Sequence, residues 1–169
     1  FFTSLAAGQR IRDPQCGFTA TSHRVLQSWN WEKSWSGYGY PNFWLIQLAK
    51  KGWTIGQIPV ESIYRKETSG IEPVSFFIRV GAMMAVEHHR RNGSWIYSKE
   101  TPMPTYGALL AYSLGWVLLF NGTLGAMGST VGIKGWQSCL AGMFCWFVAH
   151  LFDRMATVAK QKVNKRATT

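Results

Sequence analysis

The two longest segments without a charged side chain lie near the C-terminus, and they constrain the fold more than any other feature. Residues 101–133 carry no charge, and residues 136–152 form a second such segment if His150 is neutral. A helix needs about 20 consecutive apolar residues to cross the hydrocarbon core of a bilayer. We therefore expect one transmembrane helix at about residues 105–125 and another at about residues 134–153.

Small residues recur at four-residue intervals in both segments, which would let the two helices pack closely. They are Gly107, Ala111 and Gly115 in the first segment and Ala141, Cys145 and Ala149 in the second. The tail, residues 154–169, carries five basic residues and no acidic one. Because basic flanks stay in the cytoplasm, we expect an integral membrane hairpin with the part of the chain before it and the C-terminal tail both cytoplasmic. The alternative is a buried hairpin within a large soluble protein.

The overall charge indicates an anionic partner. Only 15% of the 169 residues are charged, and the net charge is +10. A basic chain can bind nucleic acid, anionic lipid or phosphorylated substrates. Because the basic residues concentrate beside the apolar segments, we expect a lipid bilayer as partner and no nucleic acid.

Residues 73–104 form an amphipathic juxtamembrane connector. Pro73 can open a helix that runs from Val74 to about Arg91. Its apolar face is predicted to hold Val74, Phe77, Ile78, Gly81, Met84 and Ala85. We expect this helix to lie at the membrane interface with Arg79, Arg90 and Arg91 near the headgroups. Packing of the helix on a sheet is the alternative.

Residues 1–72 show helical and extended patterns in alternation. Ser22 is a plausible N-cap, and Pro41 can open a helix that Gly52 ends. Residues 18–20 and residues 53–64 are typical of strands, with Pro59 demanding an edge or a bulge. This alternation predicts part of an α/β or α+β sheet.

Three polar or aromatic clusters in residues 1–72 could carry chemistry. Residues 12–17 place Arg12 beside Asp13 in a turn, and a guanidinium binds phosphate by a bidentate fork. Residues 64–70 follow the expected strand with adjacent cations, hydroxyls and a glycine that could hold a phosphate. Aromatic residues 29–40 could stack on a sugar or lie at the bilayer surface. The alternative for residues 12–17 is a structural turn, and for residues 64–70 it is a solvated loop. For the aromatic residues it is core packing.

Four ordered motifs in this region resemble family 2 glycosyltransferases of the polyprenol-phosphate branch, such as dolichol-phosphate mannosyltransferases. Residues 11–24, IRDPQCGFTATSHR, resemble D-x-Q-x-G-F-(R/K)-A-x-x-R. Residues 45–55, LIQLAKKGWTI, resemble L-I-x-x-A-x-x-x-G-x-x-I, and residues 57–64, QIPVESIY, resemble E-(V/I)-P-(V/I)-x-x-x-Y. Residues 69–74, SGIEPV, resemble the S-x-I-x-P stretch that follows.

This resemblance implies an α/β fold in which residues 1–72 are the C-terminal, acceptor-side part of a GT-A domain. The donor half, with its Asp-x-Asp site for Mg or Mn, would lie outside this chain, so the fragment alone would be inactive. The substrates implied are a nucleotide sugar, GDP- or UDP-hexose, and polyprenyl or dolichyl phosphate. By motif, Arg12 would contact the lipid-linked phosphate, and Asp13, Gln15 and Cys16 would line its pocket. Arg65 and Ser69 would lie on a loop that closes over phosphates.

The chain departs from the family pattern at Thr19, where Arg or Lys is usual, and at residues 41–43, where an acidic residue is usual. A different substrate or reduced activity would account for both departures. A second hypothesis is a non-catalytic membrane scaffold that binds lipid or a partner. Neither hypothesis fixes the sugar, the polyprenol or a homo-oligomeric state.

Overall fold

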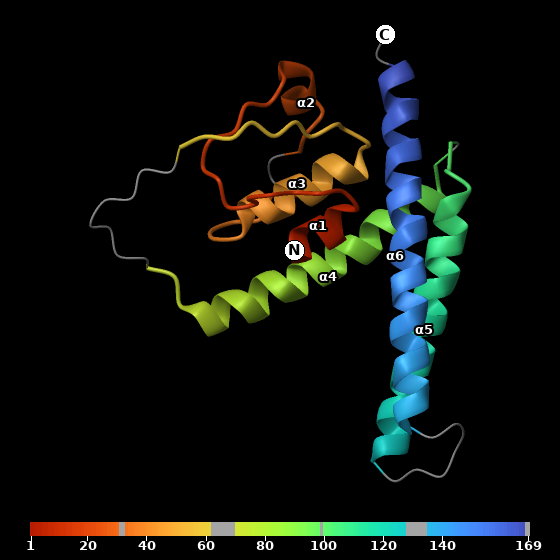
Figure 1. Cartoon of the computed structure of the whole chain (residues 1–169). Helices are drawn as coiled ribbons and strands as arrows, with labels where there is room; N and C mark the ends of the chain where they lie inside the picture. Colours follow the sequence, from red (N-terminus) through yellow and green to blue (C-terminus); the bar gives the residue numbers. More distant parts are fainter. Residues whose placement is uncertain (31–32, 62–69, 99, 128–134, 168–169) are drawn as a thin grey trace. The chain divides into compact units, whose positions relative to one another are not determined.

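The computed structural model describes the chain except for residues 31–32, 62–69, 99, 128–134 and 168–169 (Figure 1). The described residues contain helices and no strand. The helices are α1 (Phe2–Ala7), α2 (His23–Gln27), α3 (Tyr40–Lys50), α4 (Pro73–Ile96), α5 (Pro104–Ala126) and α6 (Gly135–Arg166).

The chain divides into two compact units, Phe1–Arg91 and Asn92–Thr169. We call them the N-terminal unit and the hairpin unit. The boundary falls within α4, later than the boundary at residue 72 that composition suggested. The tail expected at residues 154–169 continues α6 as helix to Arg166.

The prediction of an α/β GT-A fold is wrong for the described residues, which contain no sheet. Residues 18–20 and the described residues of the second expected strand, 53–61, form no ladder. A strand is stabilised by a neighbour that pairs with its backbone and covers its apolar side chains. Ile58 lacks such cover and is 86% exposed, and Val60 is also exposed.

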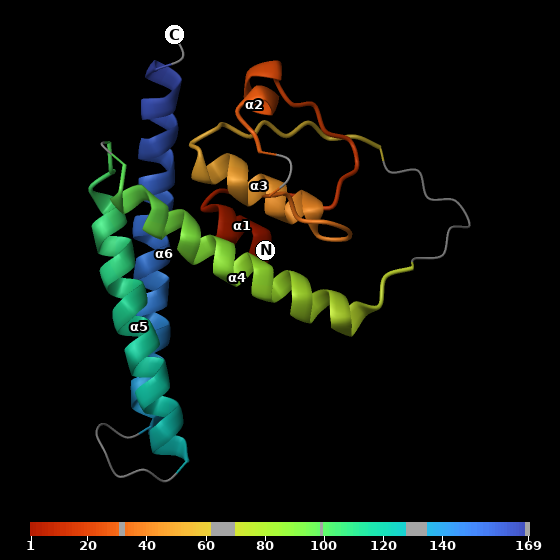
Figure 2. The ribbon, with the colours of Figure 1, turned by 180° about the vertical axis from the view of Figure 1, so that it is seen from behind.

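Three helices share the core of the N-terminal unit (Figure 2). Its buried apolar residues are Ala6, Ala7, Ile11, Phe43, Ile46, Ala49, Val80 and Met83. Gly39 before α3 has φ of 101°, and Gly52 after it has φ of 74°, a region that glycine adopts without strain. Pro41 lies in the first turn of α3 as expected. Turn chemistry therefore sets both ends of α3, and apolar burial fixes its inner face.

Polar contacts tie the same helices together. Thr3 Oγ1 donates to Asn42 Oδ1 at 2.9 Å, joining α1 to α3. Gln47 Nε2 donates to Glu87 Oε2 at 2.6 Å, joining α3 to α4. Buried polar groups destabilise a fold unless they are hydrogen-bonded, so these pairs restrict how α1 and α4 can pack on α3.

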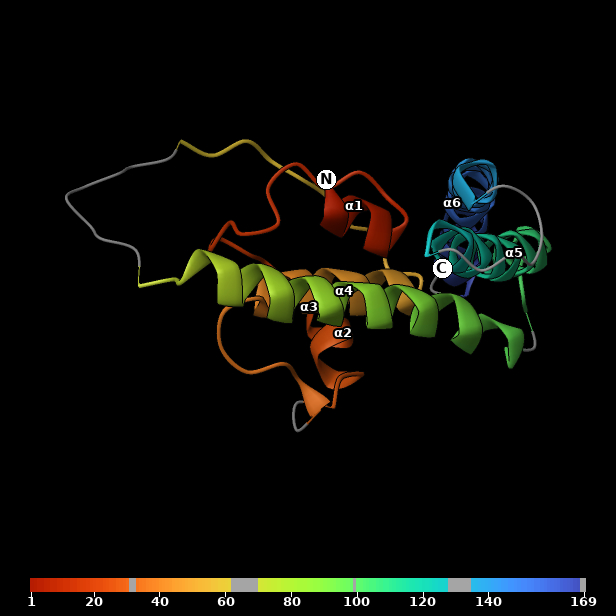
Figure 3. The ribbon, with the colours of Figure 1, turned by 90° about the horizontal axis from the view of Figure 1, so that it is seen from below.

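The hairpin unit consists mainly of α5 and α6, which run in opposite directions and are seen end on in Figure 3. Glycines set their separation. A Cβ on Gly115 would lie 2.2 Å from Trp146 Cδ1, and one on Gly142 would lie 3.0 Å from the Gly115 carbonyl oxygen. A Cβ on Gly122 would lie 2.8 Å from the Gly135 carbonyl oxygen. The backbones therefore approach closely, as small residues allow.

The small-residue prediction is confirmed for Gly107, Gly115 and Ala149, which lie at the helix contact. Ala141 is exposed instead. Opposite α5, backbone atoms of Gly135, Cys139 and Gly142 would lie within 3.1 Å of a Cβ on Gly115 or Gly122. Both α5 and α6 are long and apolar enough to cross a membrane, and only 22% of the most apolar window of each is buried.

Candidate functional site

The loop that contains Arg12 is held from two sides. Ile11 is buried, and its backbone N–H donates to Ser4 Oγ at 2.9 Å while Ser4 Oγ donates to the Ile11 carbonyl at 3.0 Å. Gln57 Oε1 accepts from the Arg12 backbone N–H at 2.7 Å, and Gln57 Nε2 donates to the Arg10 carbonyl at 2.8 Å. One amide side chain thus pairs with this backbone as a neighbouring strand would. We call this arrangement the Gln57 clamp.

The side chains that follow the clamp face outward. Arg12, Asp13 and Gln15 are exposed, and Cys16 is half-buried. Asp13 Oδ1 accepts from the Gln15 backbone N–H at 3.0 Å, which closes a local turn. The clamp and the turn therefore fix the backbone while the Arg12 guanidinium points to the surface, where it could meet an anionic group.

Of the residues carried over from the family motifs, Asp13, Gln15 and Cys16 lie in this loop beside Arg12. Arg65 and Ser69 lie outside the described residues, so their placement beside Arg12 remains a prediction. Sequence reasoning missed the role of Gln57, because an amide that pairs with a backbone 45 residues away leaves no local pattern.

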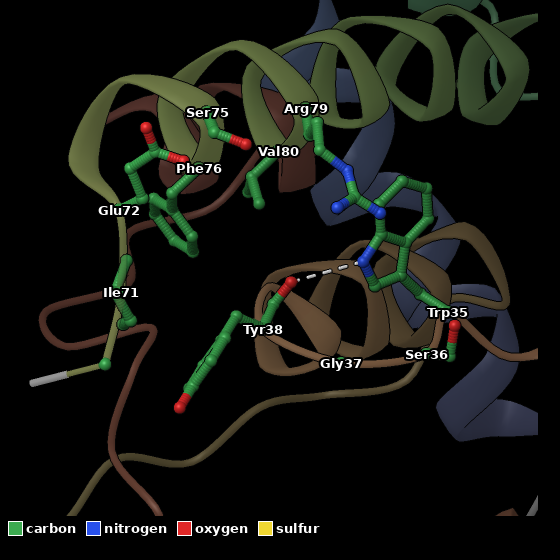
Figure 4. A pocket seen from close by; sticks show the side chains of 11 residues that line it. Trp35, Ser36, Gly37, Tyr38, Ile71, Glu72, Ser75, Phe76, Arg79 and Val80 are labelled. Carbon is green, nitrogen blue, oxygen red and sulfur yellow. Dashed lines mark hydrogen bonds between the residues drawn. The ribbon is translucent and has the colours of Figure 1, made fainter.

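A cavity of about 210 Å³ lies elsewhere in the N-terminal unit (Figure 4). The loop before α3 and the first turns of α4 form its walls. Its chemically distinctive lining residues are Trp35, Tyr38, Glu72, Ser75 and Arg79. An indole, a hydroxyl and a guanidinium in one hollow can bind a ring with a polar group, and the Glu72 carboxylate in the same lining opposes an anionic one.

Backbone geometry holds the aromatic wall of the cavity against α4. Trp35 Nε1 donates to the Tyr38 carbonyl at 3.3 Å, as Figure 4 shows. A Cβ on Gly39 would lie 2.7 Å from Val80 Cγ2, so only glycine allows this approach. Neither this cavity nor the adjoining hollow of about 420 Å³, which also includes Arg79, is lined by the Arg12 loop. The structure thus separates two candidate binding places.

The aromatic-rich segment has divided roles. Trp29 packs in the core, with its ring centroid 4.7 Å from that of Trp44. Tyr40 stacks on Trp44 at 6.4 Å. Trp35 and Tyr38 line the cavity. Trp31 lies outside the described residues. Trp35 also packs against the core, so both core packing and the cavity wall account for the described side chains of this segment.

Two groups beside the aromatic core titrate abnormally. Burial raises the pKa of the Tyr40 hydroxyl above its ordinary value of 10.0. Burial lowers the pKa of the Lys51 ammonium below its ordinary value of 10.5. Lys51 Nζ donates to the Ser28 carbonyl and lies 5.2 Å from the centroid of a Trp29 ring. Both groups contact the aromatic core, Tyr40 through Trp44 and Lys51 through Trp29.

The helix expected at the membrane interface is α4, and its two sides differ. Val74, Phe77 and Ile78 are exposed, and Phe2 adds a ring 6.2 Å from Phe77. These four residues form what we call the outer apolar face. Arg79 lines the cavities described above.

The two consecutive arginines near the end of the N-terminal unit take opposite environments. The Arg90 side chain is 67% exposed and pairs with Glu87 at 2.9 Å. Arg91 is 0% exposed, and its Nε donates to the Ala6 carbonyl at 2.9 Å. Arg91 was expected at the headgroups with Arg79 and Arg90. It is buried instead and joins α4 to α1 by a hydrogen bond.

No three His, Cys, Asp or Glu side chains gather as a metal site among the described residues. Comparison with protein families, with curated proteins and with solved structures finds no match to this chain. The functional argument therefore depends on the residues themselves.

Proposed function

We propose that this chain supplies the acceptor side of a membrane-anchored glycosyltransferase, which moves a hexose from a nucleotide sugar to polyprenyl phosphate. The observation that carries the proposal is the exposed Arg12 guanidinium on a backbone fixed by the Gln57 clamp. Arg12 belongs to the first of the ordered motifs, so the motif and the geometry favour the same residue. The proposal does not depend on a sheet.

The acceptor in this reaction is already an anion, so the chemistry needs positioning more than a strong base. A phosphate oxygen attacks the anomeric carbon, the bond from that carbon to the diphosphate breaks, and the nucleoside diphosphate leaves. Arg12 would hold the acceptor phosphate by charge-assisted hydrogen bonds. A divalent cation on the donor side, with ligands outside this chain, would stabilise the leaving diphosphate.

A membrane position of the chain supports the same proposal, because polyprenyl phosphate resides in a bilayer. We propose that α5 and α6 span that bilayer with both flanks cytoplasmic, according to the positive-inside rule. The outer apolar face of α4 would then meet the bilayer surface.

The test is transfer of radiolabelled hexose from GDP- or UDP-hexose to polyprenyl phosphate by native membranes that contain the protein. We expect Arg12→Ala to lower transfer about 10- to 100-fold, the effect of losing a hydrogen-bonded ionic contact. Arg10→Ala is the matched control, because it removes an exposed cation from the same loop and keeps the Arg10 carbonyl that Gln57 binds. Equal activity of the two variants would contradict the role of Arg12. Absence of transfer by the wild type, with every donor tried, would favour the non-catalytic scaffold.

A further inference from the structure

Helix α6 is longer than a membrane span requires. Its 32 residues correspond to about 48 Å, whereas the hydrocarbon core is about 30 Å thick. Figure 1 shows α6 continuing well past the start of α5 within the hairpin unit. Its last turns therefore extend beyond the end of the helix with which it pairs.

Along one face of α6, the exposed side chains are apolar at first and mostly basic toward the C-terminus. Exposed side chains recur at intervals of three or four residues, the spacing that keeps them on one side of a helix. In order they are Leu140, Phe144, Phe147, Leu151, Arg154, Val158, Lys162 and Lys165. The members up to Leu151 are the side chains that lipid would contact. We call Arg154, Lys162 and Lys165 the basic stripe.

The other side of the same turns is used internally. Asp153, Ala156 and Thr157 are buried. Lys160 lies on this inner side, and its Nζ donates to Ser98 Oγ at 2.9 Å. Asp153 is the only acidic residue after residue 100, so no carboxylate of α6 shares the face of the basic stripe.

We propose that the basic stripe binds the phosphate groups of anionic phospholipids in the leaflet next to the C-terminus. The stripe continues the lipid-facing side of α6, so its side chains lie over lipid and not over α5. Side chains on a helix tilt toward its N-terminus, which here is toward the bilayer. If the span ends near residue 153 as expected, Lys162 lies about 14 Å farther along the helix, and its long side chain reaches back toward the headgroup layer.

This inference rests on the membrane-spanning part of the proposed function and not on sugar transfer. It also differs from the positive-inside rule, which counts charges without regard to their face on the helix. Five basic residues occupy the last turns of α6. The basic stripe lies on the lipid-facing side of the helix and Lys160 on the inner side. Substitutions on the two sides should therefore affect lipid binding differently.

The experiment reconstitutes the full chain in vesicles of equal phosphatidylcholine and phosphatidylglycerol, and native mass spectrometry then counts the lipids that stay bound after extraction. We expect the wild type to retain phosphatidylglycerol preferentially. Each cation near the surface contributes about a fivefold preference, so Lys162→Gln with Lys165→Gln should lower it about 25-fold. Lys160→Gln, the matched control, should leave the preference within about twofold of wild type.

Several outcomes would overturn the proposal: no preference in the wild type, no loss in the double variant, or an equal loss in Lys160→Gln. A variant with Lys162→Arg and Lys165→Arg keeps the charge and should keep the preference, which separates lipid binding from damage to the helix. Alkaline carbonate extraction of the same vesicles shows whether membrane spanning or only lipid binding has failed. Release of the wild type would contradict both the membrane-spanning hairpin and lipid binding by the basic stripe. Retention without a lipid preference would contradict only lipid binding by the basic stripe.

Discussion

The N-terminal unit and the hairpin unit are held together by different means. The N-terminal unit buries apolar side chains and crosses its core with polar pairs, such as Gln47 with Glu87. The hairpin unit buries few large side chains at its helix contact and relies on glycines that bring backbones together. Burial of apolar surface drives folding in water, whereas lipid tails are as apolar as leucine, and helices in lipid gain stability mainly from close packing. The contrast is the one expected if α5 and α6 lie in lipid, as we propose.

The largest expected effect tests the glycine contact. In Gly115→Leu the new side chain would overlap Trp146 and the Gly142 carbonyl, so the helices must separate. We expect a loss of about 3 kcal/mol in hairpin stability, the upper range for overpacking. The midpoint of detergent-driven unfolding of the full chain in SDS measures it. Ser113→Leu adds similar bulk at an exposed position of α5 and should change the midpoint little. Equal tolerance of both changes would show that close approach is unimportant.

A second expected effect tests the polar core of the N-terminal unit. Glu87→Ala leaves the buried Gln47 amide without its 2.6 Å partner. An unsatisfied buried donor costs about 1–3 kcal/mol. Thermal unfolding followed by near-UV circular dichroism reports this loss.

Arg90→Gln is the control for that variant, because it removes the other partner of Glu87. The ion pair is largely exposed on the Arg90 side, so its loss should cost about 0.5 kcal/mol or less. If Arg90→Gln destabilised the unit as much as Glu87→Ala, the surface ion pair would matter and the buried amide contact would not.

The smallest expected effect concerns the Gln57 clamp. Gln57→Ala removes two hydrogen bonds from an exposed loop, and each contributes about 1 kcal/mol or less. Hydrogen exchange at the Arg12 amide should accelerate by up to about fivefold. Gln57→Glu keeps the acceptor for that amide and loses only the donor to Arg10, so the Arg12 amide should stay protected. An unchanged exchange rate of the Arg12 amide in Gln57→Ala would show that the loop is ordered without the Gln57 clamp.

Local signals predicted the helices well. Residues without charge marked α5 and α6, Ser22 marked the start of α2, and Pro41 with Gly52 marked α3. The described part of the expected strand, residues 53–61, is not a strand, because pairing depends on a distant partner that no local pattern encodes. Sequence spacing also placed Arg91 among outward cations, although position 91 continues the inward line of Val80, Met83 and Glu87.

The candidate site was predictable only in part. The motif singled out Arg12 and Asp13, and both are exposed on an ordered turn. The Gln57 clamp, the cavity beside Arg79 and the approach of Gly39 to Val80 all join residues far apart in the chain. Such contacts arise from packing, so composition and spacing could not reveal them.

The polar contact inside the hairpin has a consequence for biogenesis. Asn121 Nδ2 donates to Ser138 Oγ at 3.2 Å, and Ser138 Oγ donates to the Leu118 carbonyl at 2.8 Å. Each side chain satisfies its polar atoms on the other helix, and a helix that entered the hydrocarbon alone would carry them without that partner. If α5 and α6 span a bilayer as we propose, this contact favours insertion of the two helices as a pair.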